Sequence, residues 1–105
     1  MFELKNSGEK FHFVLKAANG EVILTSQMYA SKASAINGIE SIQKNCGKDS
    51  SFEILTAKNG KIYFNIKATN GLIIGSSQMY SAESGAKNGI KSVQKNAPGA
   101  ITKEV

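Results

Sequence analysis

Residues 16–45 read KAANGEVILTSQMYASKASAINGIESIQKN, and residues 67–96 repeat them, displaced by 51 positions, as KATNGLIIGSSQMYSAESGAKNGIKSVQKN. More than half of the aligned positions are identical. A unit of this size is too small to bury its own apolar face, so two units are expected to share one core. The repeat therefore predicts a single domain, residues 1–105, made of two repeats (about 1–47 and 51–98) and a C-terminal tail, 99–105.

The first half of each repeat predicts a β-hairpin. Along residues 10–18 and 61–69, every second residue is apolar and the residues between are polar or apolar. This period of two is typical of a strand with one face in the core. Asn19-Gly20 and Asn70-Gly71 follow these strands, and Asn-Gly between two β-rich runs predicts a two-residue type I′ turn. The residues expected on the inner face are Phe11, Phe13, Leu15 and Ala17, and then Ile62, Phe64, Ile66 and Ala68.

A two-residue loop also fixes which residues face each other across the hairpins. The expected pairs are Ala18 with Glu21, Leu15 with Leu24, Phe13 with Ser26, Ile66 with Gly75, and Phe64 with Ser77. The outer face would then carry Ile23 and Ile74 near Lys16 and Lys67. Such a face is more apolar than a freely solvated one, so either the chain partly covers it or it is a contact surface. Scattered surface aliphatic residues explain it equally well.

The second half of each repeat predicts a helix. The apolar stripes at helical spacing are Ala35, Gly38, Ile39, Ile42 and Cys46, and then Ala86, Gly89, Ile90, Val93 and Ala97. Ser31 and Ser81 are the expected N-caps, and Gly47 and Pro98-Gly99 are the expected stops. A glycine on a buried stripe costs helix propensity, so Gly38 and Gly89 predict close approach of helix to sheet.

Shorter strands are expected at 2–5 and 51–56, ahead of the hairpins, and a final edge strand at 100–105. The fold class is therefore α+β: two β-β-β-α repeats forming one pseudo-two-fold domain, with antiparallel strands packed against helices.

The composition narrows the function. The chain has one histidine (His12), one aspartate (Asp49) and one cysteine (Cys46), so neither a catalytic triad nor a zinc site is indicated. His12 and Cys46 are better explained as a half-exposed strand residue and a packing residue. We expect no catalytic residues, no metal, no cofactor and no enzymatic activity. Without a signal peptide or a spanning segment, the expected location is the cytoplasm.

The net charge is +5 because 13 basic residues, all of them lysine, outnumber eight acidic ones. Arginine supplies most bidentate phosphate and base recognition, and the lysines are spread along the chain. A solvated lysine-rich surface is therefore the favoured explanation, and weak, non-specific nucleic-acid binding is the alternative function.

The Asn-Gly hairpin, the Ser-Gln-Met-Tyr segments (26–29 and 77–80), and the helices that carry Asn-Gly-Ile and end in Gln-Lys-Asn together resemble the YegP-like family of small bacterial proteins. The resemblance covers nearly the whole chain, once per repeat. It implies a two-layer α+β fold in which tandem copies stand in for a homodimer of single-copy relatives, so we expect a monomer. It supplies no catalytic residues.

The preferred function is a non-catalytic binding or protein-interaction module with an unknown protein partner. Ser-Gln-Met-Tyr is favoured as a structural strand-to-helix junction, and a pair of recognition corners is the alternative. The candidate binding residues are Lys16, Ile23, Gln27 and Tyr29 in the first repeat and Lys67, Ile74, Gln78 and Tyr80 in the second.

Overall fold

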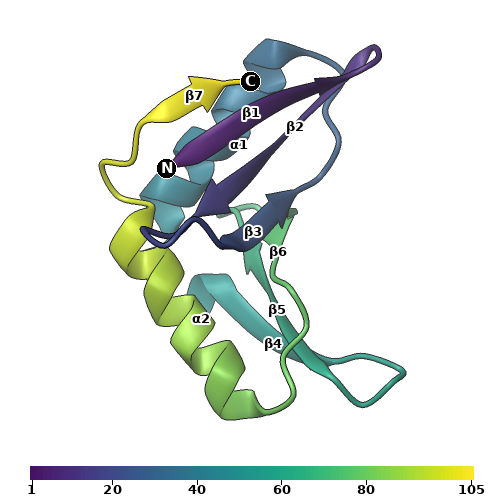
Figure 1. Ribbon diagram of the computed structural model, residues 1–105, viewed down its shortest axis with the longest axis vertical. Helices are drawn as coiled ribbons and strands as arrows, with labels where there is room; N and C mark the ends of the chain where they lie inside the picture. Colours follow the sequence, from purple (N-terminus) through teal and green to yellow (C-terminus); the bar gives the residue numbers. More distant parts are fainter.

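The computed structural model describes residues 1–105 as one mixed seven-stranded sheet with two α-helices (Figure 1). This confirms the α+β class. The elements in chain order are β1 (Phe2–Ser7), β2 (Lys10–Lys16), β3 (Val22–Ser26), α1 (Lys32–Asn45), the 3₁₀ turn η1 (Asp49–Ser51), β4 (Phe52–Thr56), β5 (Ile62–Lys67), β6 (Ile73–Ser76), α2 (Glu83–Asn96) and β7 (Thr102–Glu104).

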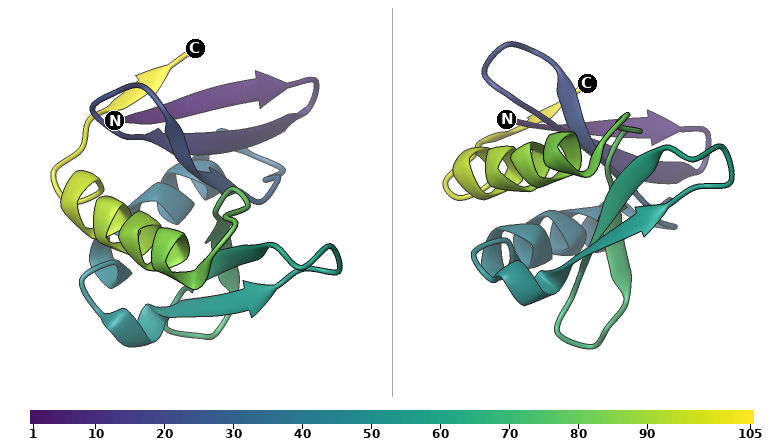
Figure 2. Two further views of the ribbon diagram at one scale, coloured as in Figure 1. Left: turned by 60° about the horizontal axis from the view of Figure 1, so that its bottom comes forward. Right: turned by 90° about the horizontal axis from the view of Figure 1, so that it is seen from below.

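The two repeats meet in the middle of the sheet. Its strand order is β4-β5-β6-β3-β2-β1-β7, and the antiparallel pair β3–β6 joins the halves. Figure 2 shows the sheet curving around the helices, with β1 and β2 on one side of them and β4 and β5 on the other. Each helix contacts strands of both repeats, so the apolar side chains form one shared core.

The hairpin turns differ from the predicted type I′. No residue other than glycine has a positive φ, whereas Gly20 has φ +85° and Gly71 has φ +84°. The N–H of Gly20 donates to the Ala17 carbonyl, and the N–H of Ala17 donates to the Glu21 carbonyl, both at 2.9 Å. The loop is therefore three residues long with a left-handed glycine at its end, and Ala17, not Ala18, faces Glu21.

A bulge in β3 and another in β6 absorb the extra loop residue. The register shifts between Leu15 and Lys16, so that Leu15 still faces Leu24 while Lys16 faces Val22. Ile66 likewise faces Gly75. These two predicted pairs are confirmed.

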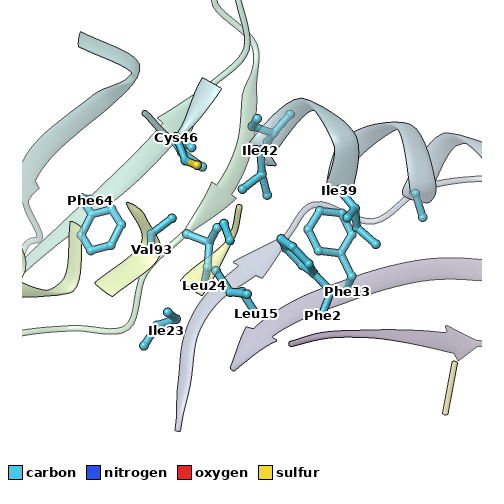
Figure 3. Close-up of a cluster of buried hydrophobic side chains, with 14 of the residues drawn as sticks. Phe2, Phe13, Leu15, Ile23, Leu24, Ile39, Ile42, Cys46, Phe64 and Val93 are labelled. Carbon is cyan, nitrogen blue, oxygen red and sulfur yellow. The ribbon is translucent and has the colours of Figure 1, made fainter. Parts of the chain in front are cut away.

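The bulge also changes where one isoleucine in each repeat points. Ile23 is 5% exposed and Ile74 is 7% exposed, and both belong to the hydrophobic core. Figure 3 shows Ile23 near Leu15 and Leu24 in this core. The prediction that they lie on an exposed outer face is wrong, because the extra residue places two consecutive side chains, such as Ile23 and Leu24, inside.

Both helices bury the predicted stripes, of which only Ile90 stays partly exposed. The Ser31 side chain accepts a hydrogen bond from the Ser34 N–H and caps α1 as predicted. The predicted cap at Ser81 is wrong: α2 starts after Ala82, which offers no side-chain acceptor. Lys44 and Lys95 lie in the last turns, where a cation interacts favourably with the helix dipole.

The C-terminal tail forms the expected final strand. β7 pairs in parallel with β1 and occupies one edge of the sheet, while β4 occupies the other. Neither helix is long and apolar enough to cross a membrane.

Candidate interaction surface

The serines of the two Ser-Gln-Met-Tyr segments have the same structural role. The Ser26 hydroxyl accepts the Phe13 N–H at 2.8 Å and donates to the Gln27 carbonyl at 2.8 Å. The Ser77 hydroxyl does the same with Phe64, at 2.9 Å, and with the Gln78 carbonyl. Each hydroxyl thus satisfies backbone groups where the strand leaves the sheet.

The tyrosines are also structural. Tyr29 forms an isolated β-bridge with Phe11, and its ring stacks on Phe13 with centroids 6.1 Å apart. A Cβ atom built on Gly38 would lie 2.5 Å from the Tyr29 Oη, so the ring occupies the space that this glycine leaves. Tyr80 repeats these contacts with Ile62, Phe64 and Gly89. The close approach predicted at Gly38 and Gly89 is confirmed.

The middle residues of the segments have no such role. Gln27 and Gln78 are exposed, and neither side chain makes a hydrogen bond within the chain. Met28 is 51% exposed and Met79 is 50% exposed. We call the pairs Gln27-Met28 and Gln78-Met79 the two corners. They form the exposed part of a segment whose other residues are held firmly in place.

Lys16 and Lys67 are engaged in ion pairs. The Lys16 Nζ lies 3.2 Å from a Glu3 carboxylate oxygen, and the Lys67 Nζ lies 3.2 Å from one of Glu53. Both pairs are partly exposed, so each adds little stability, but each neutralises the local charge. Neither lysine is therefore a free cation for a phosphate group.

The sheet face away from the core is more polar than expected. One row of cross-strand neighbours runs through it: Glu53, Asn65, Ser76, Thr25, Val14 and Glu3. The Ser76 hydroxyl donates to the Asn65 Oδ1 at 2.6 Å. With Ile23 and Ile74 in the core, Val14 is the one aliphatic residue of this row.

His12 lies between Phe13 and Phe11, whose partners Ser26 and Tyr29 flank the Gln27-Met28 corner, whereas Cys46 lies at the end of α1. His12 is half-buried, and its Nδ1 is buried without a hydrogen-bond partner. Cys46 is buried in the core, and this burial raises the pKa of its thiol, which disfavours the reactive thiolate. No group of three or more His, Cys, Asp or Glu side chains is placed to hold a metal ion.

Of the eight candidate binding residues, the structure exposes Gln27 and Gln78, pairs Lys16 and Lys67 with carboxylates, and partly buries Tyr29 and Tyr80. It places Ile23 and Ile74 in the core. Met28 and Met79 were missed as candidates, although an exposed methionine is among the more adaptable contact residues. Their identity in both copies was visible in the sequence, but their exposure depends on how the chain turns after Ser26 and Ser77.

Known proteins similar to this chain belong to one family. The model of a family described as "Domain of unknown function (DUF1508)" matches twice, at residues 6–53 and 57–104. The UPF0339 protein of Bordetella pertussis is 53% identical and aligns over 98% of this chain and 93% of its own length. The UPF0339 protein YegP of Escherichia coli O157:H7 is 52% identical over 98% of this chain and 94% of its own.

Two solution NMR structures share the fold. The UPF0339 protein SO3888 of Shewanella oneidensis is 51% identical and superposes with a TM-score of 0.92, covering 98% of this chain and 88% of that one. The protein of unknown function yegP from E. coli is 50% identical, also with a TM-score of 0.92, covering 98% and 90%. With two family matches over most of its length and relatives at about half identity, the chain belongs to the DUF1508 family of YegP-like proteins, whose function is unknown.

Proposed function

We propose that this protein is a non-catalytic protein-interaction module that contacts its partner through the two corners, Gln27-Met28 and Gln78-Met79. One observation carries the proposal: these four exposed side chains are the same in both repeats, yet none makes a hydrogen bond or packs in the core. An exposed methionine beside an exposed amide offers an adaptable apolar contact and a hydrogen-bonding group together.

The sequences around the corners support this proposal. On one side, Leu24-Thr25 corresponds to Gly75-Ser76, and on the other, residues 30–34 share no identity with residues 81–85. Recent duplication alone would not leave four identical residues between such drifted neighbours. Ser and Tyr are explained by their backbone and ring contacts, whereas the fold gives Gln and Met no reason to stay the same.

We also propose that an approximate two-fold axis relates the repeats and passes between Thr25 and Ser76. These residues occupy equivalent positions in the two copies and face each other across the antiparallel β3–β6 pair. Figure 1 shows the chain leaving β3 and β6 in opposite directions toward α1 and α2. The protein would then present both corners as a monomer, without a second chain.

The test replaces Gln27, Met28, Gln78 and Met79 by alanine, at one corner or at both. Exposed replacements of this kind change the free energy of unfolding by about 0.5 kcal/mol or less, which urea unfolding verifies. A partner isolated with the unmodified chain and then purified should bind a single-corner variant more weakly and the double-corner variant not at all. Leu72→Ala, at another exposed apolar position, is the matched control.

Unchanged affinity of the double-corner variant for that purified partner would refute the proposal. Fluorescence anisotropy with a short oligonucleotide separates it from the alternative function. Binding at low salt that the corner replacements do not alter would instead support the lysine-rich surface.

A further inference from the structure

The first strands of the two repeats, β1 and β4, have nearly the same sequence, but only β1 is covered by a further strand. β1 carries Phe2-Glu3-Leu4 and β4 carries Phe52-Glu53-Ile54. They pair with their hairpins in the same way, Leu4 with Phe13 and Ile54 with Phe64. β7 lies outside β1, whereas nothing lies outside β4.

Because no strand pairs with the outer side of β4, apolar side chains of β4 stay partly exposed. Phe2 is 0% exposed and Leu4 is 2% exposed, whereas Phe52 and Ile54 are only half-buried. Beside them is an open hollow of about 400 Å³ between β4 and α2, to which Ile90 also contributes. The hollow lies next to the β4 edge and is available to a side chain from a strand added there.

The backbone of β4 also has free hydrogen-bonding groups. Phe64 directs its N–H and C=O toward Ser77, on the β6 side, so its β4 neighbour Ile54 points its own N–H and C=O away from β5. Ile62 similarly pairs with Tyr80, which leaves the groups of Thr56 pointing outward. At the covered edge, the Leu4 carbonyl accepts the Val105 N–H at 3.0 Å. The Phe52 N–H already donates to the Asp49 carbonyl, so Ile54 and Thr56 are the available anchors.

One lysine beside the hollow is available to an acidic side chain. Lys87, Lys91 and Asp49 line the hollow. Lys87 pairs with Glu83 at 3.3 Å and the Asp49 carboxylate accepts a hydrogen bond from the Gln94 side chain at 2.8 Å, whereas Lys91 has no ion pair. At the covered edge, Glu104 of β7 forms an ion pair with Lys32 of α1. A second copy of this chain is a poorer occupant, because each copy carries a net charge of +5 and its β7 is already paired with its own β1.

We propose that the β4 edge binds an extended peptide segment of another protein, added parallel to β4 as β7 is added to β1, with an apolar side chain in the hollow and an acidic side chain toward Lys91. Strand addition of this kind takes its affinity from main-chain hydrogen bonds and its specificity from alternate side chains. The site is separate from the corners and does not depend on them.

The experiment uses the whole chain, ¹⁵N-labelled, and a synthetic peptide with the sequence of residues 100–105, AITKEV, as the probe. Amide shifts are expected at Ile54, Thr56 and Ile90, while those of β1 stay in place. Thr56→Pro removes an outward N–H at an exposed edge position, where proline is tolerated, and should weaken binding about tenfold. Thr56→Ala keeps that N–H and should stay within about twofold of the unmodified chain.

Charge is tested in the same titration. Lys91→Glu should weaken binding, whereas Lys95→Glu, the same change one turn further along α2, should not. Three results would overturn the proposal: no shifts at millimolar peptide, shifts confined to β1 and α1, or a concentration-dependent dimer that Thr56→Pro abolishes. The last would mean that a second copy covers β4. Loss of corner binding leaves all these readouts unchanged, so the two proposals fail separately.

Discussion

Replacing Gly38 with alanine tests the contact between helix α1 and the Tyr29 ring. The added Cβ would lie 2.5 Å from the Tyr29 Oη, 2.9 Å from its Cζ and 3.0 Å from the Phe13 Cε2. The ring cannot simply swing away, because it stacks on Phe13 and its backbone is bridged to Phe11. The core must therefore shift to accept one methyl group.

Two opposing terms set the size of the effect. Alanine is favoured over glycine in a helix by about 1 kcal/mol. Overpacking a well-filled core costs about 1–3 kcal/mol. Since three atoms lie at 3.0 Å or closer, we expect the steric term to win, with a net loss of about 1–2 kcal/mol and a decrease in Tm of about 5–10 °C.

Tyr29→Phe provides the internal check. The Tyr29 hydroxyl makes no hydrogen bond within the protein and is the atom nearest to the new Cβ, so its removal should relieve much of the clash. Gly38→Ala in the Tyr29→Phe background should cost less than about 1 kcal/mol, a coupling that a double-mutant cycle measures. Gly47→Ala, where nothing lies within 4 Å of the added Cβ, is the control.

Urea unfolding followed by circular dichroism gives the free energies of unfolding of all these variants. A Gly38→Ala protein as stable as its parent would show that helix propensity outweighs packing here. If Gly38→Ala costs the same free energy with and without the Tyr29→Phe change, the lack of coupling would show that the tyrosine hydroxyl is not what requires a glycine.

Two further predictions concern the core. Ile23→Lys should lower the free energy of unfolding by more than about 3 kcal/mol, because it buries a charge. Val22→Lys, at the exposed neighbouring position, should change this free energy little. Equal urea midpoints for the two variants would contradict the burial of Ile23. Burial raises the pKa of the Cys46 thiol and the pKa of the Tyr29 phenol above their ordinary values, so the unfolded chain loses these protons first. This contribution to stability is present below the unfolded-state pKa values and is lost as the pH rises through the folded-state ones. The urea midpoint should therefore fall in alkaline solution and fall less in a Cys46→Ala, Tyr29→Phe variant; an identical alkaline decrease in both proteins would refute the assignment.

The repeat, the strand and helix positions, and the buried stripes of both helices could be predicted from the sequence, because they follow from local periodicity and from turn-forming residues. The close approach at Gly38 and Gly89 could also be predicted, since a glycine on a buried stripe needs a packing reason. The partner in that contact could not: the ring comes from Tyr29 or Tyr80, and its position depends on the path of the chain after the strand.

The local sequence does not determine the strand register near the turns. A two-residue loop and a three-residue loop with a compensating bulge both leave Leu15 facing Leu24, and no residue in the hairpin distinguishes them. Only the tertiary structure places Ile23 inside, because burying one more apolar side chain from each hairpin in the shared core is favourable. The predicted outer-face contact surface rested on that single position.

By itself, the sequence determined that two copies of one β-hairpin and helix unit build this protein, because alternation, helical spacing and turn residues are local properties. Tertiary structure alone decided that the copies join through β3 and β6, that β7 covers β1, and that β4 stays open. The sequences of β1 and β4 are nearly the same, so the difference lies in residues 102–104, which pair with β1 and not with β4.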